Sequence, residues 1–314
     1  MELASKFELH YYLSDASHSM NALVKNKCET EFLAVTSEVA EILGIHLELD
    51  CEALKEGGVR EIWKALGDNN PQITLLMAAL ALIWSVIPQT DNELSDLQKE
   101  DLRLSIEERK LEIDKLKQEI EDGVTSEAIE KAAAEALRSC KVATRKSNFY
   151  KILSKYEKVT QVGFIELDNE NNSLSNEKLV ARDKFHSFIL RSQDLKPLKN
   201  SSARIEIAAP VLTDSKAKWK GFYEDQMISF AMNDQDFKRA VVAKQQSFKN
   251  GDEIICVLLI DRKVDEIGEI VTSGYSVDVV LETIHSGVKS KTIQGEQYLK
   301  MVEGQRDMFD AEKE

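Results

Sequence analysis

The longest apolar run constrains the fold most, because its 15 residues must be removed from water. The run begins at Ile73 and ends at Ile87, and only Thr74 and Ser85 interrupt it. As a helix it would be about 22 Å long, whereas a bilayer span needs about 20 apolar residues. No Lys or Arg flanks it closely. We therefore predict a core or oligomer-interface helix. The alternative is a membrane-associated oligomer that contacts lipid through this run.

The residues around this run predict a small α/β module over residues 1–90. Phe7, Leu9 and Tyr11 alternate with polar residues, which is typical of a strand with one buried face. Three further elements are predicted before the apolar helix: a long helix that ends near residue 43, a strand over 45–49 and a short helix over 59–66.

Residues 93–120 differ in character, because charges alternate in sign there and Gly and Pro are absent. Apolar residues recur every seven positions in two incomplete stripes, which predicts a helical connector over residues 91–140 that self-associates as a short coiled coil. A solvated connecting helix with one apolar edge is an equal alternative, because Asp101 and Glu108 interrupt the first stripe. The residues predicted to self-associate are Leu97, Leu104, Ile106, Leu111, Ile113 and Ile120.

Short apolar runs between turn residues predict a β-rich C-terminal module over residues 141–302. One helix over residues 234–243 is predicted between its strands, which would form a small twisted sheet or a partly closed barrel. A charged, flexible tail is predicted for residues 303–314. The predicted fold class is therefore α+β, with the small α/β module, the connecting helix and the β-rich module in that order.

The net charge of -14 is unevenly distributed: residues 1–140 carry -14, residues 141–250 carry +7 and residues 251–314 carry -7. Lysines interleaved with an aromatic residue can bind phosphates and stack on bases, so the basic segment predicts nucleic-acid binding. The alternative is that Trp219, Phe222 and Tyr223 pack inward while the lysines only solubilise the module. The candidate residues are Lys141, Arg145, Lys146, Lys216, Lys218, Trp219 and Lys220.

No motif of strong catalytic specificity occurs, and no cofactor or metal site is predicted. The order of Asp252, Asp261 and Lys263 resembles the acid, acid-x-Lys order of restriction-like endonuclease cores, which hold Mg²⁺ with carboxylates. That family places its second acid inside a strand, whereas Asp261 is expected here to follow a strand and begin a loop. A charged hairpin end is the alternative.

The segment from Gln305 to Phe309 is similar to the short peptide by which many bacterial proteins dock on the replication sliding clamp. That resemblance implies partner contacts by Gln305, Asp307, Met308 and Phe309. The alternative is an amphipathic remnant at the end of the chain.

Four scattered cysteines and an N-terminus without a basic or apolar segment predict a cytoplasmic protein with reduced thiols. The modular pattern favours a non-enzymatic oligomeric adaptor that binds a protein partner, and its architecture is analogous to accessory proteins of bacterial antiviral defence complexes. The alternatives are a nucleic-acid-binding or nucleic-acid-processing protein that uses the basic module, and the membrane-associated oligomer.

Overall fold

The computed structural model describes residues 3–15, 19–52, 59–66, 70–86 and 124–311. The chain forms two compact units: unit 1 comprises residues 1–194 with 264–270, and unit 2 comprises residues 195–263 with 271–314. Both helices and strands contribute, in agreement with an α+β class. The predicted boundary at residue 141 falls inside unit 1, so the first unit is larger than the sequence pattern indicates. The predicted coiled coil lies outside the described residues.

Unit 1 contains an antiparallel sheet with the strand order β2-β3-β1-β4-β5. Its strands are β1 (Lys6–Leu13), β2 (Glu48–Glu52), β3 (Val59–Leu66), β4 (Val159–Leu167) and β5 (Lys178–Ala181). The central strand β1 pairs with β4, which follows it by about 150 residues in the chain. This long-range pairing is why β4 belongs to unit 1 and not to the C-terminal module in which it was expected.

The predicted short helix over residues 59–66 is wrong, because these residues form β3 and pair with β1. In the register, Trp63 lies opposite Phe7 and Glu61 lies opposite Leu9, so both face the helices with the apolar side of the sheet. Glu61 is 1% exposed and forms an ion pair with Lys25. A charged residue at an inward position breaks the apolar alternation by which a strand is recognised.

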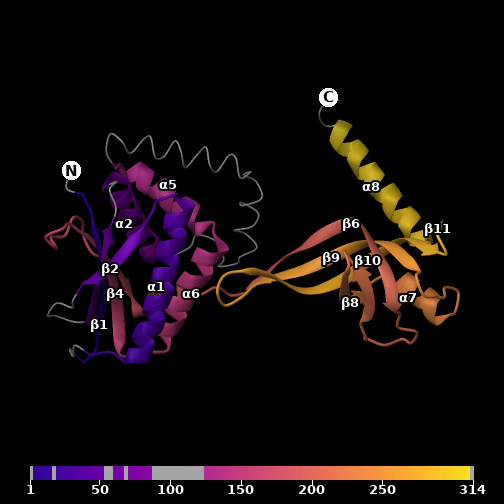
Figure 1. The fold of residues 1–314 in the computed structure, drawn as a ribbon, viewed down its shortest axis with the longest axis horizontal. Helices are drawn as coiled ribbons and strands as arrows, with labels where there is room; N and C mark the ends of the chain where they lie inside the picture. The colour runs from indigo at the N-terminus through magenta and orange to yellow at the C-terminus, as the bar shows by residue number, and fades with distance from the viewer. Residues whose placement is uncertain (1–2, 16–18, 53–58, 67–69, 87–123, 312–314) are drawn as a thin grey trace. The chain divides into compact units, whose positions relative to one another are not determined.

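Four helices pack on one face of the sheet (Figure 1): α1 (Ala22–Ile42), α2 (Asn70–Ser85), α5 (Ser126–Leu137) and α6 (Cys140–Ser154). The face is identified by ring contacts, because Phe7 of β1 lies 5.3 Å from Phe32 of α1 between ring centroids. Side-chain caps fix where α1, α5 and α6 begin, with Asn21, Thr125 and Ser139 accepting from backbone N–H groups of the first turn. A 3-10 helix, η1 (Arg182–Phe188), follows β5.

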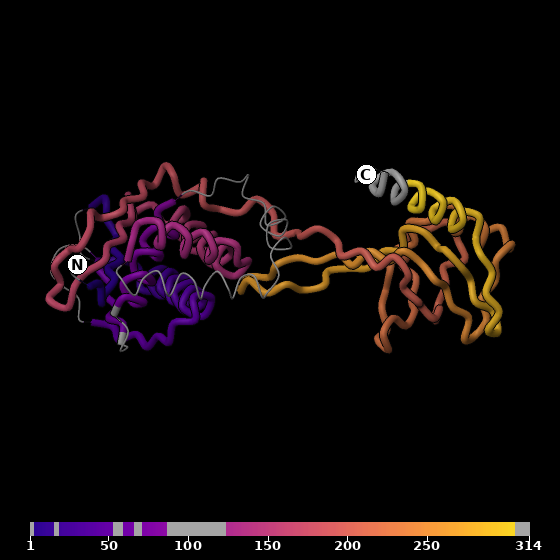
Figure 2. Tube along the Cα trace, turned by 90° about the horizontal axis from the view of Figure 1, so that it is seen from above, coloured from indigo at the N-terminus to yellow at the C-terminus, as the bar shows by residue number. Residues whose placement is uncertain are grey.

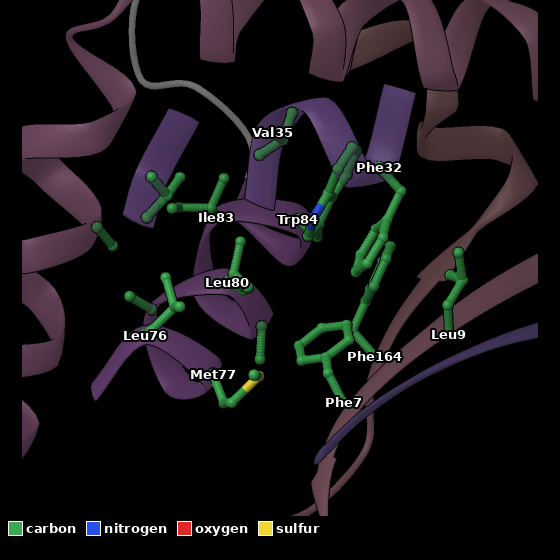
Figure 3. Packing of buried hydrophobic residues seen from close by; sticks show 14 of the residues in the cluster. Phe7, Leu9, Phe32, Val35, Leu76, Met77, Leu80, Ile83, Trp84 and Phe164 are labelled. Carbon is green, nitrogen blue, oxygen red and sulfur yellow. The ribbon is translucent and has the colours of Figure 1, made fainter. Parts of the chain in front are cut away.

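Helix α2 contains most of the apolar run and lies in the core of unit 1 (Figure 3). The ring of Trp84 stacks between two phenylalanines, with centroid distances of 5.4 Å to Phe32 and 5.8 Å to Phe164. Because Leu76, Leu80 and Trp84 are each fully buried, the part of the run from Ile73 to Trp84 packs within this unit. Across the described residues, no helix combines the length and the apolarity that a bilayer span requires.

The opposite face of this sheet carries ion pairs. Lys6 and Glu8 alternate with the core-facing residues of β1 and are nevertheless buried. The Lys6 Nζ lies 2.7 Å from Glu52 Oε1, and an Arg60 guanidinium nitrogen lies 3.1 Å from Glu8 Oε1. Pairing of this kind is what allows charged groups to be buried.

Unit 2 contains a closed five-stranded barrel, whereas the sequence predicted a small twisted sheet or a partly closed barrel. β6 pairs with β7, β7 with β8, β8 with β10 and β10 with β9, and β9 closes the barrel by pairing with β6. Its strands are β6 (Asp194–Ala209), β7 (Trp219–Tyr223), β8 (Gln226–Met232), β9 (Glu253–Val264) and β10 (Ile270–His285), and a short β11 (Val288–Lys291) pairs with β10. Strands β6, β7 and β8 are antiparallel neighbours, whereas β8 and β10 are parallel.

The predicted inserted helix is α7 (Gln235–Val242), which lies between β8 and β9 in the chain. Its Phe237 packs near Trp219 at a centroid distance of 6.3 Å. The last described element is α8 (Ile293–Ala311), which is yellow in Figure 2. Residues 303–311, expected in a flexible tail, therefore belong to a helix.

Candidate nucleic-acid interface

The exposed side of β7 and β8 brings together four side chains that we name the β7–β8 face: Lys220, Phe222, Met227 and Ser229. Lys220 lies opposite Ser229 and Phe222 lies opposite Met227 in the antiparallel register. Directly opposite residues of an antiparallel pair share one side of the sheet. Phe222 is 39% exposed and Met227 is 62% exposed, so two large apolar side chains meet solvent beside a lysine.

The alternation within each strand explains this face. Residues next to it in sequence point inward: Trp219 is 1% exposed, and Ile228 and Phe230 are also buried. Successive side chains of a strand point to opposite sides, so burial of these three residues leaves Phe222 and Met227 outside. Neither residue was predicted as a site residue, although the same alternation would have identified both.

Trp219 belongs to the barrel core. Its ring packs against Phe248 at a centroid distance of 5.5 Å in an edge-on arrangement. The predicted aromatic stacking residue is therefore unavailable to a base. The alternative that the aromatic residues pack inward is correct for Trp219 and wrong for Phe222, which is exposed. The exposed aromatic side chain of this strand is Phe222, three residues later.

The three lysines of this region remain exposed. Lys216 and Lys218 lie in the connection between β6 and β7, and Lys220 lies on β7. None of the three forms an ion pair with another residue that the structure describes. They are thus free to meet phosphate groups at one end of the β7–β8 face.

Acidic residues mark the other end. Glu224 and Asp225 form the turn between β7 and β8 and have φ values of 49° and 62°. Positive φ at both central positions is the conformation of a two-residue type I′ hairpin. Two carboxylates at this turn would repel phosphate groups. The backbone phosphates of a bound nucleic acid would therefore lie nearer the lysine end of the face.

The other predicted basic residues lie on α6 in unit 1. Lys141 Nζ lies 3.0 Å from Glu269 Oε1, and an Arg145 guanidinium nitrogen lies 3.3 Å from Glu31 Oε2. Both cations are therefore already paired with carboxylates.

Lys146 is 2% exposed, so it cannot meet a phosphate. Its Nζ donates a hydrogen bond of 2.8 Å to the carbonyl oxygen of Val86, just beyond the last residue of α2. Burial lowers the pKa of Lys146 to about 7. Lys146 therefore satisfies a carbonyl group at the C-terminal end of α2 and does not form part of a ligand site.

The candidate nuclease residues are not brought together. Asp261 and Lys263 lie within β9, whereas Asp261 was expected to begin a loop. Asp252 precedes the same strand, and nine residues of extended chain span about 30 Å. Asp252 and Asp261 therefore cannot share one metal ion. Within the described ranges, no group of three or more His, Cys, Asp and Glu side chains could hold a metal.

Asp252 has a structural environment instead. It accepts a hydrogen bond of 2.6 Å from the backbone N–H of Lys249, and its Oδ2 lies 2.9 Å from His285 Nδ1. Burial alone would raise the pKa of Asp252, but these hydrogen bonds outweigh it and lower the pKa below its usual value. This carboxylate fixes the turn that precedes β9.

The proposed clamp-docking residues, Gln305, Asp307, Met308 and Phe309, fall on the backbone of α8. The predicted self-association residues, from Leu97 to Ile120, lie outside the described residues. Comparison with known proteins found no matching family model, no matching curated protein and no matching solved structure.

Proposed function

We propose that this chain is a non-enzymatic binding protein whose barrel holds single-stranded nucleic acid across the β7–β8 face. The observation that carries the proposal is the pairing of exposed Phe222 and Met227 beside Lys220. Exposed bases stack on aromatic side chains while lysines neutralise the backbone. A duplex keeps its bases stacked inside, so a flat apolar patch with lysines at one end favours a single strand.

The order and direction of the barrel strands support the same binding surface. Three antiparallel strands, a helix and two closing strands, with the third strand parallel to the fifth, resemble the OB-fold barrel. Barrels of that type bind oligonucleotides on the face of their second and third strands, which correspond in order to β7 and β8. A fold alone does not establish a function, so the proposal depends on the side chains of the face.

Fluorescence anisotropy tests the proposal with the full chain and fluorescein-labelled dT12, rU12 and a 12-base-pair duplex, each at two salt concentrations. We expect the single strands to bind more tightly than the duplex and to weaken as salt increases. Phe222→Ala should weaken binding by about 5-fold to 100-fold, the range measured for lost base stacking. Lys218→Glu with Lys220→Glu should weaken it by about tenfold or more.

The matched control is Lys289→Glu with Lys291→Glu, which makes the same charge change on β11. If the control weakens binding as much as the β7–β8 substitutions, general electrostatic attraction explains the binding and the face is not the site. A wild-type chain that binds neither single strand contradicts the proposal outright. The adaptor role, the link to antiviral defence and self-association through residues 93–120 stay predictions.

A further inference from the structure

A groove of about 590 Å³ lies between α1 and the edge strand β2 in unit 1. Glu29, Leu33 and Ser37 line it from α1 at a spacing of four residues, which places them on one side of the helix. Leu49 and Cys51 line it from β2. The floor is apolar, because Ala40, Ile45 and Trp63 are nearly fully buried there.

The strand beside this groove has a free edge. β2 is the outermost strand of the sheet and pairs with β3 on one side, with Leu49 opposite Ala65 and Cys51 opposite Trp63. Among the described residues, no strand pairs with its other edge. The N–H and C=O groups that point to that side can therefore accept an added strand.

The surroundings of the groove are acidic. Glu29 and Glu41 line it from α1. Glu48 and Asp50 alternate with Leu49, so they point to the other side of the same strand. Lys25 is already paired with Glu29 and Glu61, and on the other side of β2 Lys64 lies opposite Asp50 in the pairing with β3. A strand that lies along β2 would thus meet apolar side chains on one side and, on the other, Glu48 and Asp50, of which only Asp50 has a lysine directly opposite.

These charges discriminate between occupants. A second copy of β2 in antiparallel pairing would bring the acidic side chains of two strands onto the same side of the joined sheet. Like charges across a strand pair are destabilising. An extended segment with basic residues on that side would be attracted instead, and its alternate apolar residues would face Leu33, Leu49 and Trp63.

We propose that this groove binds an extended, basic segment of a partner protein, which adds to β2 as a further strand. The segment alternates apolar and basic residues, so that apolar side chains enter the groove and Lys or Arg side chains meet Glu48 and Asp50. The site lies wholly in unit 1 and is independent of nucleic-acid binding by the barrel. Charged residues on an edge strand also serve to prevent aggregation, and the experiment separates that role from binding.

The test measures binding of fluorescein-labelled nine-residue peptides to the full chain by anisotropy. The first peptide alternates Val and Lys, and the second alternates Val and Glu. The third has the first sequence with alternate backbone amides N-methylated on the edge-facing side. We expect the Val–Lys peptide to bind and each of the other two to bind about tenfold more weakly or worse, because each loses either the charge or the backbone donors.

Glu48→Lys with Asp50→Lys should weaken binding of the Val–Lys peptide by about tenfold, because it replaces the two carboxylates that the basic side chains would meet. The matched control, Glu157→Lys with Glu170→Lys, makes the same charge change at exposed positions that do not line the groove. Circular dichroism checks that each variant is folded. Absence of binding by the wild type overturns the proposal, and so does equal binding of the N-methylated peptide or an equal loss in the control.

Discussion

Unit 1 and the barrel of unit 2 bury charged groups in different ways. Unit 1 places Glu61 and Lys146 within its core, and each depends on one side-chain or carbonyl partner. The barrel buries Asp234 and Asp252, and both accept hydrogen bonds from backbone N–H groups: Asp234 from Phe237 and Val280, and Asp252 from Lys249. Burial lowers the pKa of Lys146 to about 7 and raises the pKa of Glu61 to about 7. The stability of unit 1 should therefore respond to pH near neutrality.

The largest expected effect tests whether the two units are independent. Trp84→Ala removes the ring that stacks between Phe32 and Phe164 and should destabilise unit 1 by about 3–5 kcal/mol. Trp219→Ala should cost the barrel a similar amount, because that ring fills the space between Phe237 and Phe248. Hydrogen-exchange mass spectrometry reports each unit separately. Loss of protection in both units from one substitution would show that they fold as a single cooperative body.

The next effect concerns Lys146, whose pKa burial lowers to about 7. An unfolded lysine keeps its proton to about pH 10.4, so the unfolded chain binds more protons and unit 1 gains stability as pH rises above 7. Between pH 7 and pH 9 the gain should be about 2 kcal/mol. Chemical denaturation at the two pH values measures it. In Lys146→Met this rise should disappear, and a rise that persists would assign it to another group.

Glu61 should give a smaller effect of opposite sign. Burial raises the pKa of Glu61 to about 7, although the ion pair with Lys25 counteracts part of the rise. The folded state binds the proton more tightly than the unfolded state, so this contribution is present at low pH and is lost as pH rises toward 7. We expect a loss of about 1–2 kcal/mol between pH 5 and pH 7.

Denaturation of Glu61→Gln over the same range provides the measurement, because the neutral amide cannot titrate. The variant should lack that decline. Glu157→Gln is the control, since Glu157 is exposed and should leave the pH dependence as in the wild type. If Glu61→Gln follows the wild-type curve, the carboxylate is not the titrating group.

The same buried charges explain which parts of the fold the sequence could predict. The alternation of Phe7, Leu9 and Tyr11 identified β1, and the apolar run identified α2, because both patterns are regular. β3 was not recognised as a strand because the charged residue Glu61 stands at an inward position. Its ion pair with Lys25 is a tertiary contact, which a local sequence pattern does not reveal. Lys146 was assigned to a basic surface for the same reason, because its partner is a carbonyl group about 60 residues away.

The candidate site shows the same division. Lysines 216, 218 and 220 were identified from composition alone, but which aromatic residue accompanies them depends on the inward direction of Trp219. That direction is set by the barrel closing over α7, which brings Phe237 and Phe248 to the tryptophan. The pairing of Phe222 with Met227 follows only from the register of the hairpin.

The smallest expected change in stability is at the β7–β8 face. Phe222→Ser and Met227→Ser remove apolar side chains that are already exposed, so each should change the free energy of unfolding of the barrel by no more than about 0.5 kcal/mol. Ile228→Ser, on the inward side of β8, is the matched control and should cost several times more, because it buries a hydroxyl group in the core. Thermal denaturation compares the three variants.

If the exposed substitutions destabilise the barrel as much as the buried one, these side chains are covered in solution and the face is a packing surface. If they leave stability unchanged while binding of single-stranded nucleic acid is lost, Phe222 and Met227 serve to contact the ligand, because an exposed apolar pair adds little to the stability of the barrel.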